Sequence, residues 1–382
     1  MNILLFKWNA VNEGLIKKAF EKLGHRVFTY YKEVISYEID TEIMKEMIFE
    51  IHKNKIECIF SFDYYPLVAS VANAVEIPYI SWTYDSPAHS LYSPTRNYST
   101  NYQFTFDKEE YLRLKSIGSN RIFYLPLASA PHFFNTKINP SKAKFSDICF
   151  LGSLYSNNKF DNIVLSDQYL KGYVDSLLNT QAFLYGCNLF EESITDEIAN
   201  RILASFDDSI PNGYSIDPRW VAASLLERKL SETERLVYLS EVGKNFYLTI
   251  YTGSKPETNI NAHYYGFADY ESQMPQIFYN AKINLHFTPR NIHSGVSLRV
   301  FDVLACHGFL LTAWQPEIVE LFEEGKELIV FSCIEEMKEK ITYFLSHDSE
   351  RNQIAEKGYE HILNEYTYEK RIEHMLTQIK TS

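Results

Sequence analysis

The segment from residue 290 to residue 302 contains residues whose types suit a phosphorylated ligand: Arg290, Ser294, Gly295, Ser297, Arg299 and Asp302. Free backbone N–H groups at the start of a helix, together with the positive end of the helix dipole, attract phosphate. A planar Arg299 guanidinium can bind a diphosphate through paired hydrogen bonds, and the Asp302 carboxylate can accept hydrogen bonds from ribose hydroxyls. The segment therefore predicts a site for a nucleotide diphosphate.

The same residues allow a second interpretation. If a helix begins at Ser297 or Leu298 and runs to about Cys306, Arg299 and Asp302 are three positions apart and share one face, as in a structural ion pair. The glycine-containing turn and the second arginine favour anion binding. His293, beside this loop, either contacts phosphate or is an exposed loop residue, and we favour the exposed loop residue.

The elements that position these residues alternate along the chain. In the first 130 residues short apolar runs such as NILLFKW and ECIFSF alternate with helical patterns. This order predicts a parallel sheet with helices on both faces. A second sheet begins with DICFLGS, where Gly152 and Ser153 end a strand at a turn. In doubly wound folds such a turn lies at the carboxyl edge of the sheet, where ligands bind.

The length of the chain and a linker-like stretch near its first third predict two domains. An N-terminal Rossmann-like domain spans residues 1–135, and a polar, proline-bounded stretch at 135–146 has the composition of a linker. A C-terminal Rossmann-like domain spans residues 136–360 and carries a helical insertion at about 158–243. Residues 361–382 form a terminal helix that packs back on the N-terminal domain. Within the insertion, Asp207 and Asp208 fall in a turn-rich segment and are interpreted as solvated, not as a metal site.

Composition excludes several classes of protein. The formal net charge of -12 and the lack of a basic run argue against nucleic-acid binding. The 5 cysteines are odd in number, far apart and without a CxxC pair, which indicates reduced thiols. The sequence has no run of 18 apolar residues, so no transmembrane segment is predicted. We expect a cytoplasmic protein. The histidines lack metal-ligand spacing, so no metal site is expected.

The run from YGFADYESQMPQIFYNAKINLHFT through SGVSLRVFDVLACHGFLLTAWQPEIVELFEEGKELIVF resembles the C-terminal domain of GT-B glycosyltransferases. It is most similar to the group related to spore-maturation glycosyltransferases, within glycosyl transferases group 1. The resemblance covers roughly residues 265–379. The N-terminal half, with SWTYDSP, is similar to the poorly characterised domain that often precedes this one. The resemblance implies an α/β GT-B fold, in which two Rossmann-like domains face a cleft.

The resemblance also implies roles for individual residues. Asp302 matches the acidic residue that binds the ribose of a nucleotide sugar, and Arg299, with Arg290 as a second cation, would hold the diphosphate. Relatives carry a glutamate at the position of Ser294, where it contacts the donor sugar. Because this chain has serine there, the sugar and the stereochemical outcome stay open. Thr312 and Glu317 match positions that face the sugar, although Glu317 also suits a charge at a helix N-terminus.

In the other half, an inverting transfer needs a base for the acceptor hydroxyl. Asp85, in the loop after PYISWTY, is the candidate base, and His89 is the reserve. Asp63, also at a strand end, is a weaker competitor. The alternative is that Asp-Ser-Pro only forms a turn capped by Asp85. Acceptor contacts are expected between Lys7 and Asn12.

These observations predict a glycosyltransferase that moves a sugar from a nucleotide diphosphate sugar to a hydroxyl acceptor, which is a protein, a surface glycan or a metabolite. Relatives commonly work without a divalent ion, so we expect a metal-independent enzyme with no cofactor. Two alternatives stay open. One is a noncatalytic module that binds a sugar or a protein, and the other is a nucleotide-sugar epimerase or hydrolase of the same fold. The nucleobase, the sugar, the acceptor and the oligomeric state are not predicted.

Overall fold

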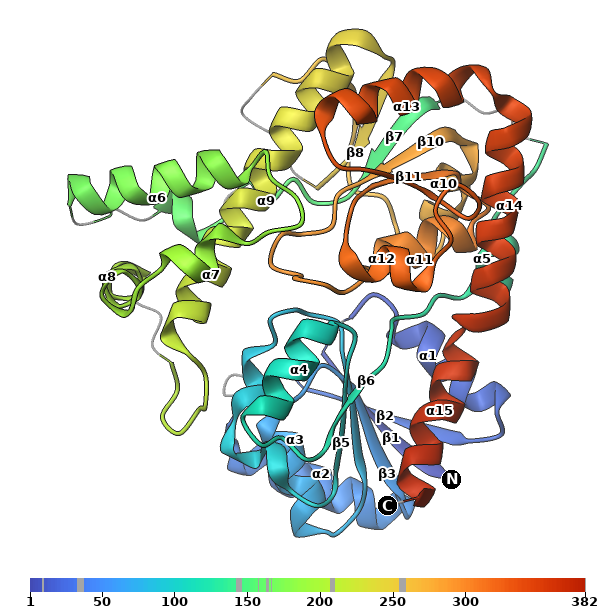
Figure 1. Cartoon of the computed structure of the whole chain (residues 1–382). Coiled ribbons are helices and arrows are strands. Elements are labelled where there is room, and N and C mark those ends of the chain that lie inside the picture. The colour runs from blue at the N-terminus through green and yellow to red at the C-terminus, as the bar shows by residue number, and fades with distance from the viewer. Residues whose placement is uncertain are drawn as a thin grey trace. The chain divides into compact units, whose positions relative to one another are not determined.

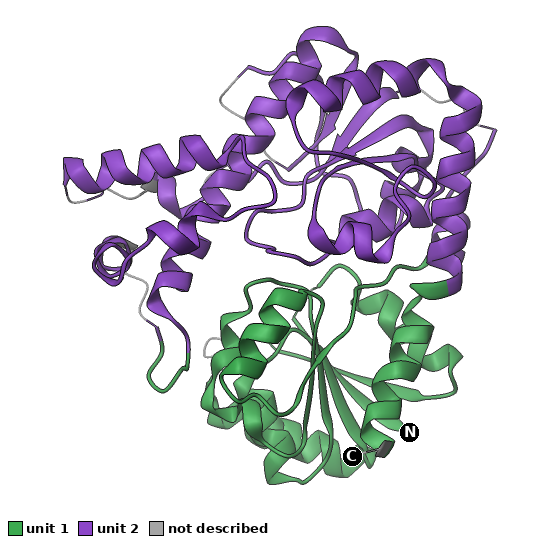
Figure 2. Cartoon of the chain, in the orientation of Figure 1, with its two compact units in different colours: residues 1–130, 211–215, 365–382 green, residues 131–210, 216–364 purple. Residues whose placement is uncertain are grey.

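The computed structural model describes residues 1–8, 10–32, 38–141, 146–156, 158–162, 165, 167–206, 210–253 and 259–381. The chain divides into two compact units (Figure 2). Unit 1 comprises Met1–Ala130, Pro211–Ser215 and Glu365–Ser382. Unit 2 comprises Pro131–Ile210 and Ile216–Asn364. Asp207 and Asp208 lie outside the described residues.

Unit 1 is built on a six-stranded parallel sheet in the order β2-β1-β3-β4-β5-β6. Its strands are β1 (Asn2–Lys7), β2 (Arg26–Tyr31), β3 (Cys58–Phe62), β4 (Tyr79–Thr83), β5 (Asn101–Thr105) and β6 (Ile122–Tyr124). Its helices are α1 (Glu13–Lys22), α2 (Thr41–Asn54), α3 (Pro66–Ala74), η1 (His89–Tyr92), η2 (Pro94–Asn97), α4 (Lys108–Ser116) and α15 (Tyr368–Thr381). Strands β3, β4 and β5 are buried along their whole length, as expected for a parallel sheet covered on both faces.

Unit 2 contains a second six-stranded parallel sheet in the order β12-β11-β10-β7-β8-β9. Its strands are β7 (Ser146–Leu151), β8 (Leu248–Tyr251), β9 (His263–Tyr265), β10 (Ala281–His286), β11 (Leu310–Ala313) and β12 (Ile329–Phe331). Around this sheet lie α5 (Pro131–Asn135), α10 (Met274–Asn280), α11 (Leu298–Ala305), α12 (Pro316–Leu321), α13 (Ile334–Ser346) and α14 (Asp348–Glu365) (Figure 1). The strand order reverses between β7 and β10, and doubly wound folds bind ligands at the carboxyl ends of strands at this point.

The helical insertion of unit 2 separates β7 from β8. It contains η3 (Lys159–Asn162), α6 (Gln168–Gln181), α7 (Leu189–Ser193), α8 (Asp196–Phe206) and α9 (Pro218–Asn245). Leu170, Phe190, Ile202 and Leu226 belong to a hydrophobic core that the insertion forms from its own helices. The long helix α9 begins after Asp217, whose side chain accepts a hydrogen bond from Arg219 N, and Pro218 occupies its first turn.

The C-terminal helix α15 belongs to unit 1. Ser129 N donates to Tyr366 O (2.9 Å), and Ser129 pairs with Thr367 in an isolated parallel bridge. The Tyr368 ring packs edge-on against Trp82 of β4, with 6.2 Å between centroids. The last residues of the chain thus complete the cover of the first sheet.

Candidate functional site

Helix α11 begins after the loop that follows β10, and this loop lies at the reversal of strand order in unit 2. Ser297 precedes the helix, and its hydroxyl lies 2.8 Å from Nε2 of the buried His286 on β10. Burial, reinforced by the charges of Arg235 and Arg299, holds the pKa of His286 well below its usual value. A neutral imidazole therefore holds Ser297 at the N-terminus of α11.

Arg299 and Asp302 share one face of α11, as predicted, and they contact each other. Asp302 is fully buried, and its Oδ1 accepts a hydrogen bond from the Tyr270 hydroxyl (2.9 Å). Its Oδ2 lies 3.5 Å from Nη1 of Arg299, whose side chain keeps 26% exposure. Arg299 can therefore meet an anion, whereas a ribose reaches Asp302 only after the side chain of Arg299 or Tyr270 shifts.

Two residues of α10 contact the Arg299 side chain. Its Nη1 lies 2.8 Å from Sδ of Met274, and its guanidinium carbon lies 5.4 Å from the centre of the Phe278 ring. A guanidinium over an aromatic face is attracted by the ring and loses little conformational freedom when it binds. Arg299 is therefore positioned before any ligand arrives.

Ser294 and Glu317 form a direct hydrogen bond between the loops that follow β10 and β11. The Ser294 hydroxyl donates to Oε1 of Glu317 (2.6 Å), and Glu317 N donates to Ser294 O (3.2 Å). Glu317 is 1% exposed and Ser294 is 9% exposed. Thr312 lies within β11, where its hydroxyl donates to Ala313 O (3.3 Å). Gly295 is buried beside Ser294. The structure thus places a carboxylate next to the serine that replaces a glutamate of the resembled family.

One face of α9 holds the loop between β10 and α11. Arg235 donates to Ser153 O (2.7 Å) and to Phe287 O (2.7 Å), so it joins the loops that follow β7 and β10. The Ser231 hydroxyl accepts a hydrogen bond from Arg290 N (2.8 Å). Sequence reasoning missed these residues, because nothing in α9 marks which polar side chains point toward a loop more than 50 positions away.

Gly152 and Ser153 form the turn after β7. Gly152 N donates to Tyr251 O (3.0 Å), and the Ser153 hydroxyl accepts a hydrogen bond from Tyr155 N (2.9 Å). The turn therefore lies at the carboxyl edge of the sheet, beside the loop that leads to α11.

The Arg290 side chain is engaged inside unit 2. Its Nη2 lies 3.0 Å from Oε1 of Glu234, which is 1% exposed, and its guanidinium carbon lies 4.0 Å from the centre of the Tyr185 ring. The Tyr185 hydroxyl also bonds to Glu234. The arginine that the sequence assigns to a diphosphate thus neutralises a buried carboxylate of α9.

We expect Arg290→Ala to lower the free energy of unfolding by about 3–5 kcal/mol, because Glu234 then stays buried without its cation. Urea unfolding measures this, with Arg219→Ala on the exposed start of α9 as the matched control. Paired replacement of Arg290 by Met and Glu234 by Leu should restore most of the loss. An Arg290→Ala variant of unchanged stability that loses nucleotide affinity would instead assign Arg290 to the ligand.

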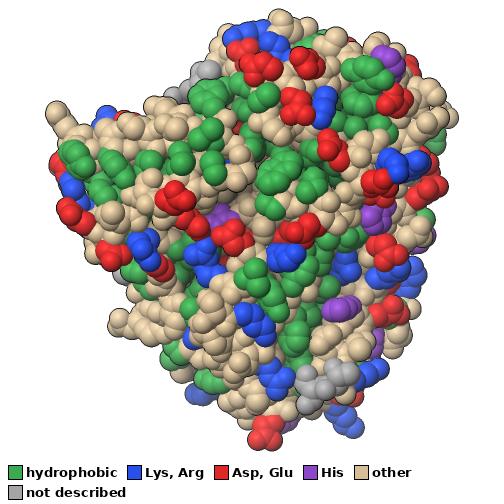
Figure 3. Space-filling model, viewed as in Figure 1, with side chains coloured by type: hydrophobic (Ala, Val, Ile, Leu, Met, Phe, Trp, Pro, Cys, Tyr) green, Lys and Arg blue, Asp and Glu red, His purple; other side chains and the backbone are tan. Residues whose placement is uncertain are grey.

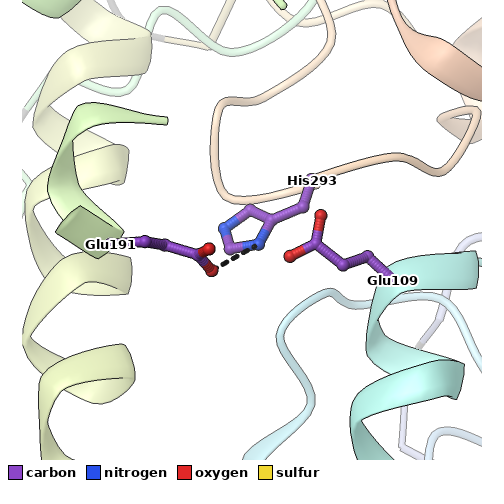
Figure 4. Close-up of side chains that lie close together, drawn as sticks. All are labelled: Glu109, Glu191 and His293. Atoms are coloured by element: carbon purple, nitrogen blue, oxygen red, sulfur yellow. Dashed lines mark ion pairs between the residues drawn. The ribbon is translucent and has the colours of Figure 1, made fainter. Parts of the chain in front are cut away.

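His293 is enclosed by the insertion. Its Nε2 lies 2.9 Å from Oε1 of Glu227 on α9. Its Nδ1 lies 3.8 Å from Oε1 of Glu191 on α7, an ion pair drawn in Figure 4. The His293 side chain is 8% exposed. The expectation of an exposed loop residue is therefore wrong, because two carboxylates distant in sequence enclose the ring.

In unit 1, the candidate base Asp85 follows β4 and is exposed. Its loop is held by Asp63, which follows β3. Oδ1 of Asp63 accepts hydrogen bonds from Tyr84 N (2.9 Å) and Asp85 N (3.3 Å). Asp63 adopts φ +56°, a left-handed conformation that aspartate tolerates better than most residues. Asp63 therefore positions the backbone that carries Asp85.

Two further carboxylates hold the same loop from the other side. Ser86 Oγ donates to Oδ2 of Asp107 (2.9 Å), and Ala88 N donates to Oε1 of Glu110 (2.8 Å). Asp107 and Glu110 are buried at the start of α4. His89, the reserve base, is exposed and is the first residue of η1. Asp85 thus lies on a loop fixed by hydrogen bonds on both sides.

Burial, with the charge of Asp85 as the second cause, raises the pKa of Asp63 to about 7 from its ordinary 3.8. The folded protein then holds a proton on Asp63 that the unfolded chain has released, so stability falls as the pH rises from about 4 to about 7. We expect Asp63→Asn, which keeps the Oδ1 acceptor, to remove this fall. Urea midpoints at pH 5 and pH 8 test it: the gain of the variant over the wild type should be larger at pH 8 than at pH 5. An equal difference at both values would contradict the assignment.

Comparison with known proteins identifies the fold. Residues 234–377 match the family model described as glycosyl transferase-like. The chain is similar to the Anabaena Alr3699/HepE structure in complex with UDP and glucose (TM-score 0.54, 12% identity, 99% of this chain and 100% of that chain). It is also similar to a glycosyltransferase from Rickettsia africae ESF-5 (TM-score 0.55, 13% identity, 100% of this chain and 99% of that chain). The chain has the GT-B fold.

A third solved structure supports this fold. Sucrose-phosphate synthase from Thermosynechococcus elongatus gives a TM-score of 0.53 at 9% identity, over 100% of this chain and 99% of that chain. No curated protein matches the chain in sequence. The glycosyl transferase-like match in sequence covers α11, Ser294 and Glu317, because these lie within residues 234–377.

Two further findings concern the surface. On the face drawn in Figure 3, acidic and basic side chains of the described residues are interspersed, in contrast to the one-sided basic surface typical of nucleic-acid binders. Among the helices that the structure describes, none is long and apolar enough to cross a membrane.

Proposed function

We propose that the protein is a glycosyltransferase that moves a sugar from a nucleotide diphosphate sugar to a hydroxyl acceptor. One observation carries the proposal: Arg299 and Asp302 lie on the first turns of α11, at the reversal of strand order in a GT-B unit. The glycosyl transferase-like match includes this helix. A helix start with a partly exposed arginine is suited to a diphosphate.

The donor roles follow from these contacts. Arg299 and the first N–H groups of α11, beside Ser297, bind the diphosphate, and Asp302 accepts hydrogen bonds from the ribose. The loop of Gly152 and Ser153 borders the phosphates at the same edge of the sheet. As the diphosphate departs it gains charge, and Arg299 stabilises that charge in a preorganised site. Arg290 takes a structural role beside Glu234.

The Glu317 carboxylate faces the donor sugar in this proposal, with Ser294 holding it and Thr312 and Gly295 shaping the same region. The Ser294 hydroxyl donates a hydrogen bond to Glu317, and the remaining acceptor capacity of the carboxylate is directed at sugar hydroxyls. Glu317, from the loop that follows β11, thereby takes the place of the glutamate that relatives carry at the position of Ser294. Hexosyl transfer is the specific reaction we propose.

On unit 1, Asp85 takes the proton of the acceptor hydroxyl as that oxygen attacks the donor sugar, and His89 is the reserve. This role applies to an inverting transfer. No divalent ion takes part in the proposed reaction, because Arg299 and the α11 dipole supply positive charge. Activity should therefore persist in EDTA.

The test uses purified protein and a panel of UDP, GDP, CDP and dTDP sugars, beginning with UDP-glucose because the similar HepE structure contains UDP and glucose. Thermal shift and released nucleotide are recorded with and without candidate hydroxyl acceptors. One donor should raise the melting temperature and release nucleotide when an acceptor is present. Binding without release in every mixture would favour a noncatalytic module, and release of an altered sugar nucleotide would favour an epimerase.

A further inference from the structure

The helical insertion carries an exposed apolar segment, residues 182–188, which joins α6 to α7 and lies along α9 (Figure 1). We call this segment the insertion loop. Its sequence, AFLYGCN, contains no charged residue, although charged residues make up 23% of the chain. Phe183 is 57% exposed and Leu184 is 37% exposed. Neighbouring apolar side chains that stay exposed indicate a binding surface.

The buried side chain of Gln181 holds the insertion loop in one conformation. Its Nε2 donates to Leu184 O (3.2 Å) and to Cys187 O (3.0 Å), and its Oε1 accepts a hydrogen bond from Leu189 N (2.7 Å). Gln181 is 2% exposed. Phe183 and Leu184 therefore lie on a fixed backbone, and a ligand that covers them does not first have to order the loop.

The insertion loop contacts residues of the segment between β10 and α11. The ring of Tyr185 faces the guanidinium of Arg290, with 4.0 Å between the guanidinium carbon and the ring centre. Asn188 Nδ2 donates to Oε1 of Glu227 (3.0 Å), and the same oxygen lies 2.9 Å from Nε2 of His293. Arg290 and His293 lead directly into the proposed donor-sugar region. The insertion loop therefore borders one side of that region.

The insertion loop also approaches the segment that follows β11. Gly186 has φ +78°, which favours glycine, and a Cβ at this position would lie 3.6 Å from Cζ3 of Trp314. The next residue, Gln315, donates from Nε2 to Ile292 O (2.7 Å), and Glu317 follows two residues later. The insertion loop thus flanks both segments that form the proposed donor-sugar region.

We propose that Phe183, Leu184 and Trp314 form the acceptor surface of the transferase, and that the acceptor hydroxyl is carried by a molecule with an aryl or alkyl group. The proposal rests on the proposed function, because it places the donor sugar beside Glu317. The acceptor oxygen bonds to the anomeric carbon of that sugar while the bond from this carbon to the diphosphate breaks and the hydroxyl proton passes to the base. The rest of the acceptor must then lie against the residues around the sugar.

The chemistry of the insertion loop favours an apolar acceptor over a charged one. Covering Phe183 and Leu184 with an aryl or alkyl group removes apolar surface of both partners from water, which stabilises the complex. A phosphate or carboxylate on the acceptor gains no countercharge from residues 182–188, since none of them is charged. The surface therefore selects for the group that carries the hydroxyl, and not for the hydroxyl itself.

The test compares phenyl and hexyl β-glucoside with methyl β-glucoside, which offer the same sugar hydroxyls and differ in the apolar group. Calorimetry measures each Kd with the protein saturated by the nucleotide diphosphate of the preferred donor. We expect the phenyl or the hexyl compound to bind the wild type about 10-fold more tightly than the methyl compound. The tighter of the two identifies the group as aryl or alkyl.

Variants of the insertion loop connect this preference to its side chains. Phe183→Ser should remove most of the preference, Leu184→Ser should remove part of it, and both should leave the Kd of the nucleotide unchanged. Phe183→Tyr keeps the ring and should keep the preference. Tyr169→Ser is the matched control and should bind as the wild type does, since Tyr169 is 69% exposed on α6 of the same insertion.

The results that would overturn the proposal differ from those that would overturn the proposed function. A wild type that binds nucleotide but prefers neither apolar glucoside contradicts the acceptor surface and leaves the proposed function standing. The same conclusion follows if Phe183→Ser keeps the full preference. If Phe183→Ser raises the Kd of the nucleotide sugar, the surface contacts the donor instead. If the wild type binds no nucleotide, the proposed function fails and the acceptor surface fails with it.

Discussion

Asp85→Asn lowers kcat by about 10²–10⁴-fold and leaves the Kd of the donor unchanged. A base that takes the acceptor proton in the transition state contributes a rate factor of this size. The Asp85 loop is held by Asp63, Asp107 and Glu110 through backbone and hydroxyl groups, so an amide at position 85 keeps the fold of the loop. Initial rates at saturating donor and acceptor, with calorimetry of donor binding, measure both quantities.

The control for this result is His89→Ala, which removes the reserve base on the same loop. We expect His89→Ala to retain most of the activity. If Asp85→Asn is fully active and His89→Ala is not, the imidazole is the base. If both variants are fully active and the product retains the anomeric configuration of the donor, the transfer needs no base from this loop.

Arg299→Ala should lower kcat/KM by about 10²–10³-fold, the usual cost of removing one preorganised charge that stabilises the leaving group. The guanidinium already rests on Met274 and Phe278, so little freedom is lost when it meets the diphosphate. Arg299→Lys should recover only part of the activity, because an ammonium group cannot grip two phosphate oxygens with a planar fork. Steady-state rates with the preferred donor measure both effects.

Arg219→Ala serves as the matched control, since Arg219 lies on the exposed start of α9 and pairs with Asp217. Its kcat/KM should equal that of the wild type. Thermal unfolding of each variant shows whether it is folded, because Arg299 also neutralises the buried Asp302. A stable Arg299→Ala variant with wild-type kcat/KM would contradict the assignment.

Local patterns in the sequence predicted those features of the fold that depend on neighbouring residues. The start of α11 at Leu298 and the break between α13 and α14 at His347 are confirmed. Both depend on short-range signals, namely the change from a turn to helical periodicity and its interruption. Arg299 and Asp302 share a helix face for the same reason.

The partners of buried polar side chains were beyond this reasoning. Strand β5 carries Asn101 and Gln103, whose polar side chains give no apolar run, yet both are buried and hydrogen-bond to Thr95 O and Arg96 O of the preceding η2 segment. Partners distant in sequence bury His293 against Glu227 and place Arg290 beside Glu234. Residue type and spacing predict a donor site at the start of α11, whereas the partners of His293 and Arg290 depend on how α9 packs.

Asp302 is the residue on which the proposed donor site depends most. We would titrate the nucleotide diphosphate of the preferred donor into wild-type protein and into Asp302→Asn, which keeps the size of the side chain and an acceptor for the Tyr270 hydroxyl. Loss of a charged hydrogen-bond acceptor should raise the Kd by about 10- to 100-fold. A folded Asp302→Asn variant that binds the nucleotide with unchanged Kd would place the donor site away from α11 and contradict the account.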